Sequence, residues 1–127
     1  MAKNILVATS QPAFGELLRL SLEESGRYRV RLVQTGREAL SSAEHILFSL
    51  AILDATLDEP PFLYVTQGLR KQQPGIRLMV IPSHEGETTP DVTAAQPDGC
   101  ITQPFYAPSL LETIHSLTEQ GSAPDAA

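Results

Sequence analysis

Three short apolar runs, separated by segments with helical periodicity, constrain the fold of this 127-residue chain more than any other feature. The runs cover residues 5–7, 50–53 and 78–81, and each is apolar at consecutive positions. Strands buried on both faces have this composition, because helices cover both sides of a parallel sheet. We therefore expect the three runs to be the central strands of such a sheet.

Helical signals lie between and after these runs. The clearest is a capping box at residues 35–38, in which the Thr35 hydroxyl and the Glu38 carboxylate each accept a hydrogen bond from the other residue's free backbone N–H. The predicted helices begin at or near Pro12, Thr35, Phe62, Pro90 and Pro108, and weaker strand-like runs cover residues 28–33 and 100–102. Strand and helix thus alternate five times.

Such alternation predicts an α/β fold: a doubly wound, five-stranded parallel sheet of order 2-1-3-4-5, with helices on both faces. We expect one domain over residues 1–119, followed by a disordered tail or the start of a linker at 120–127, where little is available to bury. Ligands of doubly wound sheets bind at the carboxyl ends of the strands, where the strand order reverses. Thr9, Ser10 and Asp54 are predicted to line this crevice, joined by Ser83 and Gln103 from the fourth and fifth strands.

Composition excludes several other classes of protein. Fifteen acidic against nine basic residues give a net charge of −6, and we find no stripe of Lys or Arg suited to a nucleic-acid duplex, so no direct nucleic-acid binding is expected. The single cysteine, Cys100, cannot form an internal disulfide and is expected to be a small buried hydrophobe. No apolar run approaches the ~20 residues that span a bilayer. We expect a cytoplasmic protein with no membrane contact.

Four motifs make a more specific comparison possible: ILVATSQPAF at residues 5–14, LAILD at 50–54, IPS at 81–83 and GCITQPF at 99–105. In this order and spacing they resemble the receiver domain of two-component response regulators, a group that includes the chemotaxis receiver. The resemblance covers residues 3–118. It implies an Asp that accepts a phosphoryl group, an acidic pair that holds Mg²⁺, and a hydroxyl residue and a Lys that contact the phosphoryl oxygens.

The resemblance places Asp54 at the acceptor position and Ser83 at the hydroxyl position. Thr9 and Ser10 replace the acidic pair, and their hydroxyls bring no charge to a cation. Capping of the first helix is an equally good role for these two residues. Gln103 replaces the Lys and offers an amide donor in place of a positive charge. The crevice therefore lacks both the metal-holding acids and the counter-charge.

Further departures affect the switch that the family uses after phosphorylation. The resemblance implies a cis peptide before Pro104, which keeps the shape of the loop. Pro82 has no N–H and stiffens the loop before the hydroxyl residue. Cys100 stands where relatives often carry a switching aromatic ring. Asp58 or Glu59 could fold back and supply a carboxylate, although acidic residues in loops are more often solvated.

These observations predict a degenerate receiver, or pseudo-receiver, that has no enzymatic activity and acts through phosphorylation-independent protein contacts. Its expected partners are a histidine kinase or other signalling protein, or an output domain, and a homodimer could form through the last helix and the fourth and fifth strands. No cofactor is expected. One alternative is a working phospho-acceptor, modified on Asp54 by a histidine kinase and dependent on Mg²⁺. Another is a sensor that binds a small molecule in the crevice.

Overall fold

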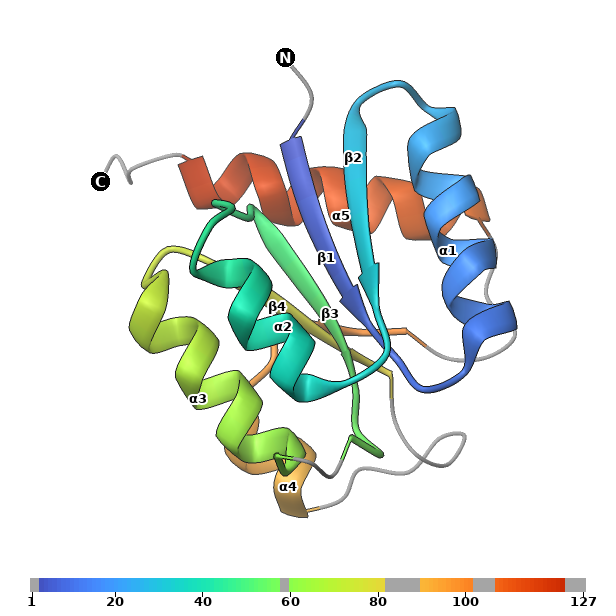
Figure 1. The fold of residues 1–127 in the computed structure, drawn as a ribbon. Helices are drawn as coiled ribbons and strands as arrows, with labels where there is room; N and C mark the ends of the chain where they lie inside the picture. Colours follow the sequence, from blue (N-terminus) through green and yellow to red (C-terminus); the bar gives the residue numbers. More distant parts are fainter. Residues whose placement is uncertain (1–2, 58–59, 82–89, 102–106, 123–127) are drawn as a thin grey trace.

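The structure is a computed structural model that describes residues 3–57, 60–81, 90–101 and 107–122. Its strands form one parallel sheet of order β2-β1-β3-β4-β5, which confirms the predicted order. In chain order the elements are β1 (Lys3–Ala8), α1 (Pro12–Glu24), β2 (Tyr28–Val33), α2 (Gly36–Ala43), β3 (Leu50–Asp54), α3 (Phe62–Gln72), β4 (Arg77–Ile81), α4 (Pro90–Ala95), β5 (Gly99–Cys100) and α5 (Ala107–Ser122). Figure 1 shows this arrangement.

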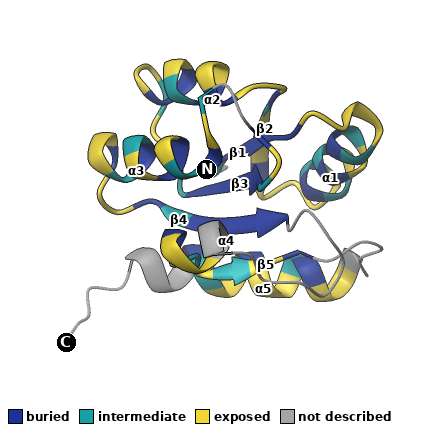
Figure 2. Cartoon of the chain, turned by 90° about the horizontal axis from the view of Figure 1, so that it is seen from below, coloured by how far each residue is buried: buried dark blue, intermediate teal, exposed yellow. Residues whose placement is uncertain are grey.

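Helices cover the two faces of the sheet. Figures 1 and 2 show α2 and α3 on one side, and α1 and α5 on the other. Successive strand residues point to opposite faces, so Leu6 packs in the cluster beneath α2 and α3, whereas Ile5 packs with α1 and α5. All five residues of β3 are buried, as a central strand between two helical layers requires.

The capping box before α2 forms with one difference from the prediction. The Glu38 N–H donates to Thr35 Oγ1 at 3.1 Å, as expected. The Glu38 carboxylate accepts from the N–H of Gln34 at 3.0 Å, one residue before the cap. Both bonds satisfy donors that would otherwise remain free at the start of the helix.

Two predictions at the C-terminal side need correction. Helix α5 continues to Ser122, so residues 120–122 are helical, whereas the sequence suggested a disordered tail or the start of a linker from residue 120. Cys100 is exposed, whereas the sequence suggested a buried position. The reason is that β5 is a two-residue edge strand, which has a neighbouring strand on one side only. Within the described ranges, no helix is long and apolar enough to cross a membrane.

Candidate functional site

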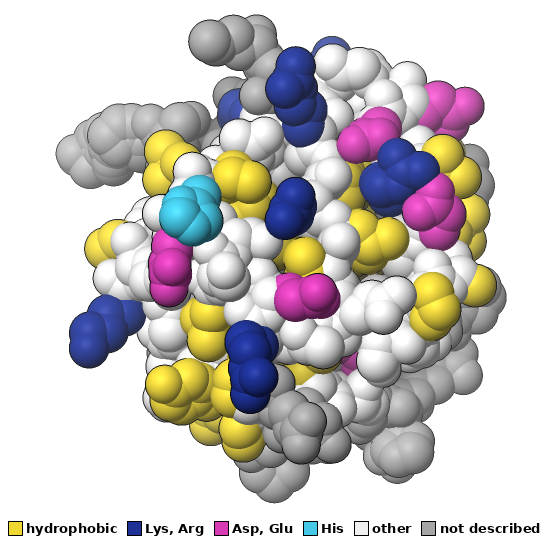
Figure 3. Space-filling model, viewed as in Figure 1, with side chains coloured by type: hydrophobic (Ala, Val, Ile, Leu, Met, Phe, Trp, Pro, Cys, Tyr) yellow, Lys and Arg dark blue, Asp and Glu magenta, His cyan; other side chains and the backbone are white. Residues whose placement is uncertain are grey.

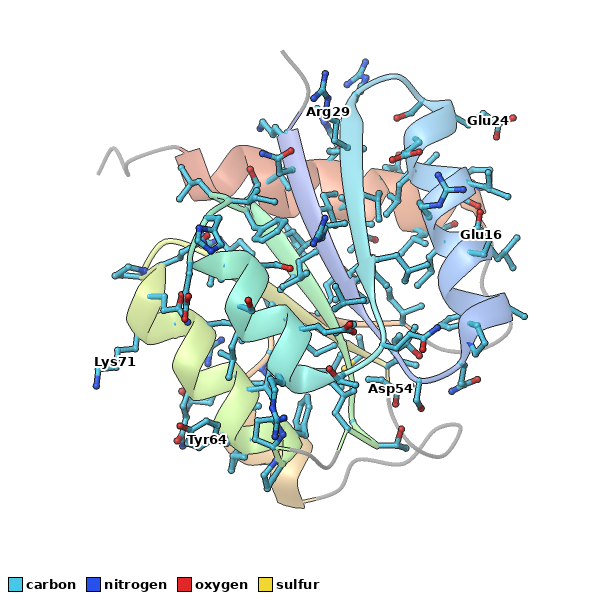
Figure 4. All side chains as sticks on the ribbon, in the orientation of Figure 1. Glu16, Glu24, Arg29, Asp54, Tyr64 and Lys71 are labelled. Atoms are coloured by element: carbon cyan, nitrogen blue, oxygen red, sulfur yellow. The ribbon has the colours of Figure 1, made fainter. Side chains whose placement is uncertain are left out.

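The carboxyl ends of β1 and β3 lie side by side, because the two strands pair in parallel with Ala8 opposite Leu53. Thr9 follows Ala8 and Asp54 follows Leu53, so these two residues lie at neighbouring positions. Both side chains are fully buried, with relative exposures of 0%. Figure 4 shows Asp54 at this end of the sheet, beside the loops that follow the strands. The crevice predicted at the point of strand-order reversal thus brings these two residues together.

Neutral donors surround the Asp54 carboxylate on both sides. Its Oδ2 accepts hydrogen bonds from Thr9 Oγ1 at 2.8 Å and from Gln11 Nε2 at 3.4 Å. Its Oδ1 accepts from the Thr56 backbone N–H at 2.9 Å and from Thr56 Oγ1 at 2.8 Å. Hydrogen bonds from donors offset the cost of burying a polar group. Asp54 is therefore satisfied by protein groups alone.

Thr9 and Ser10, which the sequence analysis treated alike, have different roles. The Thr9 hydroxyl donates to Asp54 and also accepts the backbone N–H of Gln11 at 3.1 Å. Ser10 is exposed and does not share this buried position. Neither residue caps α1, so the capping role was wrong: the N-cap is Gln11, no side chain makes a cap bond, and Pro12 opens the helix. Proline suits this position because the first N–H groups of a helix lack intrahelical partners.

Two residues of the site were missed from the sequence. Thr56 lies two positions after Asp54, and an Asp that accepts the N–H two residues later is a common turn motif. That spacing was a usable signal. Gln11 reaches Asp54 with its amide, and nothing in the local sequence distinguishes it from a solvated loop residue. Only the meeting of the β1 and β3 ends gives it a partner.

Several predicted site residues lie outside the described part of the chain, so their assigned roles stay predictions. These residues are Asp58, Glu59, Pro82, Ser83, Gln103 and Pro104. Cys100 is described, beside Val80 in the β4–β5 pair. Although its side chain is exposed, partial desolvation by its neighbours raises the pKa of the Cys100 thiol. The thiol is therefore protonated and weakly nucleophilic at neutral pH.

A divalent cation does not fit the described side of the crevice. Mg²⁺ is held by carboxylates and phosphate oxygens with several waters, and Thr9 and Ser10 supply hydroxyls only. Both oxygens of Asp54 already accept hydrogen bonds from Thr9, Gln11 and Thr56. No group of three or more His, Cys, Asp or Glu side chains is placed to bind a metal ion among the residues that the structure describes.

Comparison with known proteins gives relatives among the response regulators, although no protein-family model matches the chain. The transcriptional regulatory protein GlrR of Escherichia coli (strain K12) is 29% identical over 124 residues, which cover 95% of this chain and 27% of that protein. The transcriptional regulatory protein QseF of Escherichia coli O157:H7 matches to the same extent. The chain thus spans about a quarter of the length of these curated relatives.

Solved structures share the whole fold. A CheY-like response regulator receiver domain protein from Methanospirillum hungatei JF-1 has a TM-score of 0.84 at 24% identity, covering 95% of this chain and 97% of that one. A Burkholderia pseudomallei response regulator was solved with a phosphorylated aspartic acid, calcium ion and citrate. It has a TM-score of 0.76 at 26% identity, and the match covers 98% of this chain and 73% of that one. The chain thus has the fold of response-regulator receiver domains and is similar in sequence to response regulators.

Proposed function

We propose that this receiver is degenerate and signals through protein contacts, without phosphoryl transfer to Asp54. The observation that carries the proposal is the set of four hydrogen bonds on the buried Asp54 carboxylate. An attacking carboxylate oxygen must approach the phosphorus atom in line with the leaving group. Oδ2 would have to give up the Thr9 hydroxyl first, and Oδ1 is held by Thr56.

Charge supports the same proposal. Phosphoryl transfer needs cations to neutralise the oxygens of the transferred group. The loop after β1 brings the hydroxyls of Thr9 and Ser10, and the sequence carries Gln103 where the resemblance implies a Lys. A phosphoryl group on Asp54 would add negative charge to a buried, neutral lining. We therefore propose no catalytic activity for the domain itself.

The proposed partners are proteins of two-component signalling: a histidine kinase, another signalling protein, or an output domain. The curated relatives are transcriptional regulatory proteins, and the chain matches only 27% of their length. This supports a receiver whose effect depends on other domains or chains. A homodimer through α5 with β4 and β5, and a cytoplasmic location, stay predictions.

One observation favours a rival function, that of a working phospho-acceptor. Asp54 ends β3, and the similar structure from Burkholderia pseudomallei contains a phosphorylated aspartic acid and a calcium ion. In this alternative, the hydrogen bonds of Thr9 and Thr56 would open to admit the donor and a cation.

Treatment of the protein with Mg²⁺ and either acetyl phosphate or beryllofluoride distinguishes the two functions. We expect no change in the intact mass and no change in the backbone amide NMR spectrum. The Asp54→Asn variant is the matched control, because it removes the nucleophile and keeps the size of the side chain. Stoichiometric modification that disappears in Asp54→Asn would establish the rival function.

A further inference from the structure

The edge strand β2 carries two exposed arginines on one face of the sheet. Arg29 and Arg31 are two residues apart, so their side chains point to the same side. Arg31 lies opposite Leu6 of β1, which packs beneath α2 and α3. The two guanidinium groups therefore stand on the face that α2 and α3 cover, at the margin where the helices leave the sheet edge open to solvent.

An exposed leucine is linked to this sheet edge through Asn4 of β1. Asn4 is the β1 residue opposite Arg29, and its side-chain amide donates to the carbonyl oxygen of Leu47 at 3.3 Å. Leu47 is 78% exposed, more than any other large apolar side chain described. On the other side, Arg31 Nε donates to Ser42 Oγ of α2 at 3.3 Å. We define the β2–Leu47 surface as the four residues Asn4, Arg29, Arg31 and Leu47.

The positive charge of this surface is not neutralised by neighbouring carboxylates. Among the described residues, no carboxylate lies within 4 Å of the guanidinium group of Arg29 or Arg31. The arginines that form ion pairs in the described part of the chain are Arg19, Arg70 and Arg77. The Glu38 carboxylate on α2 accepts the Gln34 N–H instead. Figure 3 shows basic side chains over β2 and α2 on this face, with apolar side chains, a histidine and separate acidic side chains around them. A chain of net charge −6 thus presents a local positive and apolar surface.

We propose that the β2–Leu47 surface binds an acidic polypeptide segment that carries a large apolar residue. Carboxylates would accept hydrogen bonds from the guanidinium groups of Arg29 and Arg31, and the apolar residue would cover Leu47. A nucleic-acid duplex is a poorer fit, because two arginines neutralise few phosphates and the net charge of the whole chain repels a polyanion. The surface lies away from Asp54, so this proposal does not depend on whether Asp54 is phosphorylated.

A direct test uses a short capped peptide with leucines at helical spacing between glutamates. Titration into the protein, followed by backbone amide NMR, should shift resonances of residues 28–31 and 46–48, and added salt should weaken binding. Arg29→Gln should raise the Kd about three-fold, the size of one exposed charge pair. Leu47→Ser should raise it as well. Lys71→Gln is the matched control, since it removes the same charge from α3, which Figure 4 shows away from Arg29, and should leave the Kd unchanged.

The same titration can overturn the proposal. Equal binding of a peptide with glutamine in place of glutamate would remove the role of charge, and equal loss in Lys71→Gln would show non-specific attraction. Shifts that map to another face would place the peptide elsewhere. Preferred binding of a DNA duplex or of phosphatidylserine vesicles at these residues would assign the surface to a different class of partner, and concentration-dependent shifts without peptide would assign it to a second copy of the chain.

Discussion

Thr9 and Asp54 are joined by a 2.8 Å hydrogen bond between Thr9 Oγ1 and Asp54 Oδ2, which connects the carboxyl ends of β1 and β3 inside the fold. Both side chains are fully buried. A direct polar contact thus links the two strand ends at the point where the resemblance to receivers implies a bound cation. The following predictions test this arrangement and the packing around it.

Replacement of Thr9 by valine keeps the branched shape of the side chain but removes its hydroxyl. Asp54 Oδ2 then loses its shortest hydrogen bond, and the Gln11 N–H loses its acceptor. We expect the free energy of unfolding to fall by about 1–3 kcal/mol, the cost of leaving a buried hydrogen-bonding group without its partner. Urea denaturation measures this change. Ser10→Ala, at the exposed neighbouring position, should have little effect, and equal losses in both variants would contradict the assigned contacts.

Restoring the acidic pair should make stability depend on Mg²⁺. In the double variant Thr9→Asp, Ser10→Asp, a new carboxylate lies beside Asp54, and like charges in a buried site destabilise the fold. We expect a lower Tm than wild type in EDTA and a rise in Tm with Mg²⁺, because a cation that binds only the folded state stabilises it. The wild-type Tm should not respond to Mg²⁺. If the Tm of the double variant does not respond to Mg²⁺, the two added carboxylates are not sufficient to make this crevice a cation site.

Gln73 should be essential for the loop between α2 and β3. Its side chain is buried, and its Oε1 accepts the Phe48 N–H at 2.8 Å, while its Nε2 donates to the carbonyl oxygens of Ala43 and Ile46. Gln73→Met keeps the length of the side chain but leaves these backbone groups without partners. We expect a loss of about 2 kcal/mol or more in urea denaturation. Gln72→Met, at the exposed neighbour, is the control and should change stability by much less.

The Glu16–Arg19 pair on α1 predicts a small pH effect. The hydrogen bond from Arg19 lowers the pKa of the Glu16 carboxyl below its usual value. A depressed pKa contributes stability above the unfolded-state pKa, and this contribution disappears as the pH falls through the folded-state value. Wild type should therefore be slightly more stable than Glu16→Gln at neutral pH, with no difference in acid. Salt should reduce the effect, because the pair is exposed. If the difference in stability between wild type and Glu16→Gln persists in acid, it arises from packing and not from the ion pair.

Much of the fold could be predicted from local patterns. Consecutive apolar residues identified β3 as buried on both faces, and Thr35 with Glu38 marked the start of α2. The differences lie in the C-terminal part of the chain. Cys100 was expected to be buried, but its strand lies at the sheet edge. Residues 120–122 have no clear periodicity, yet they continue α5.

The candidate site also has features that local sequence determines and features that depend on distant segments. The sequence by itself determined that Asp54 ends a central strand and that hydroxyls stand where a receiver would carry acids, because these facts depend on residue types and their order. Only the tertiary structure decided that Thr9 and Gln11 donate to the Asp54 carboxylate while Ser10 faces solvent. The physical reason is that these two hydrogen bonds join residues 45 and 43 positions apart, and they exist only once β1 and β3 have paired.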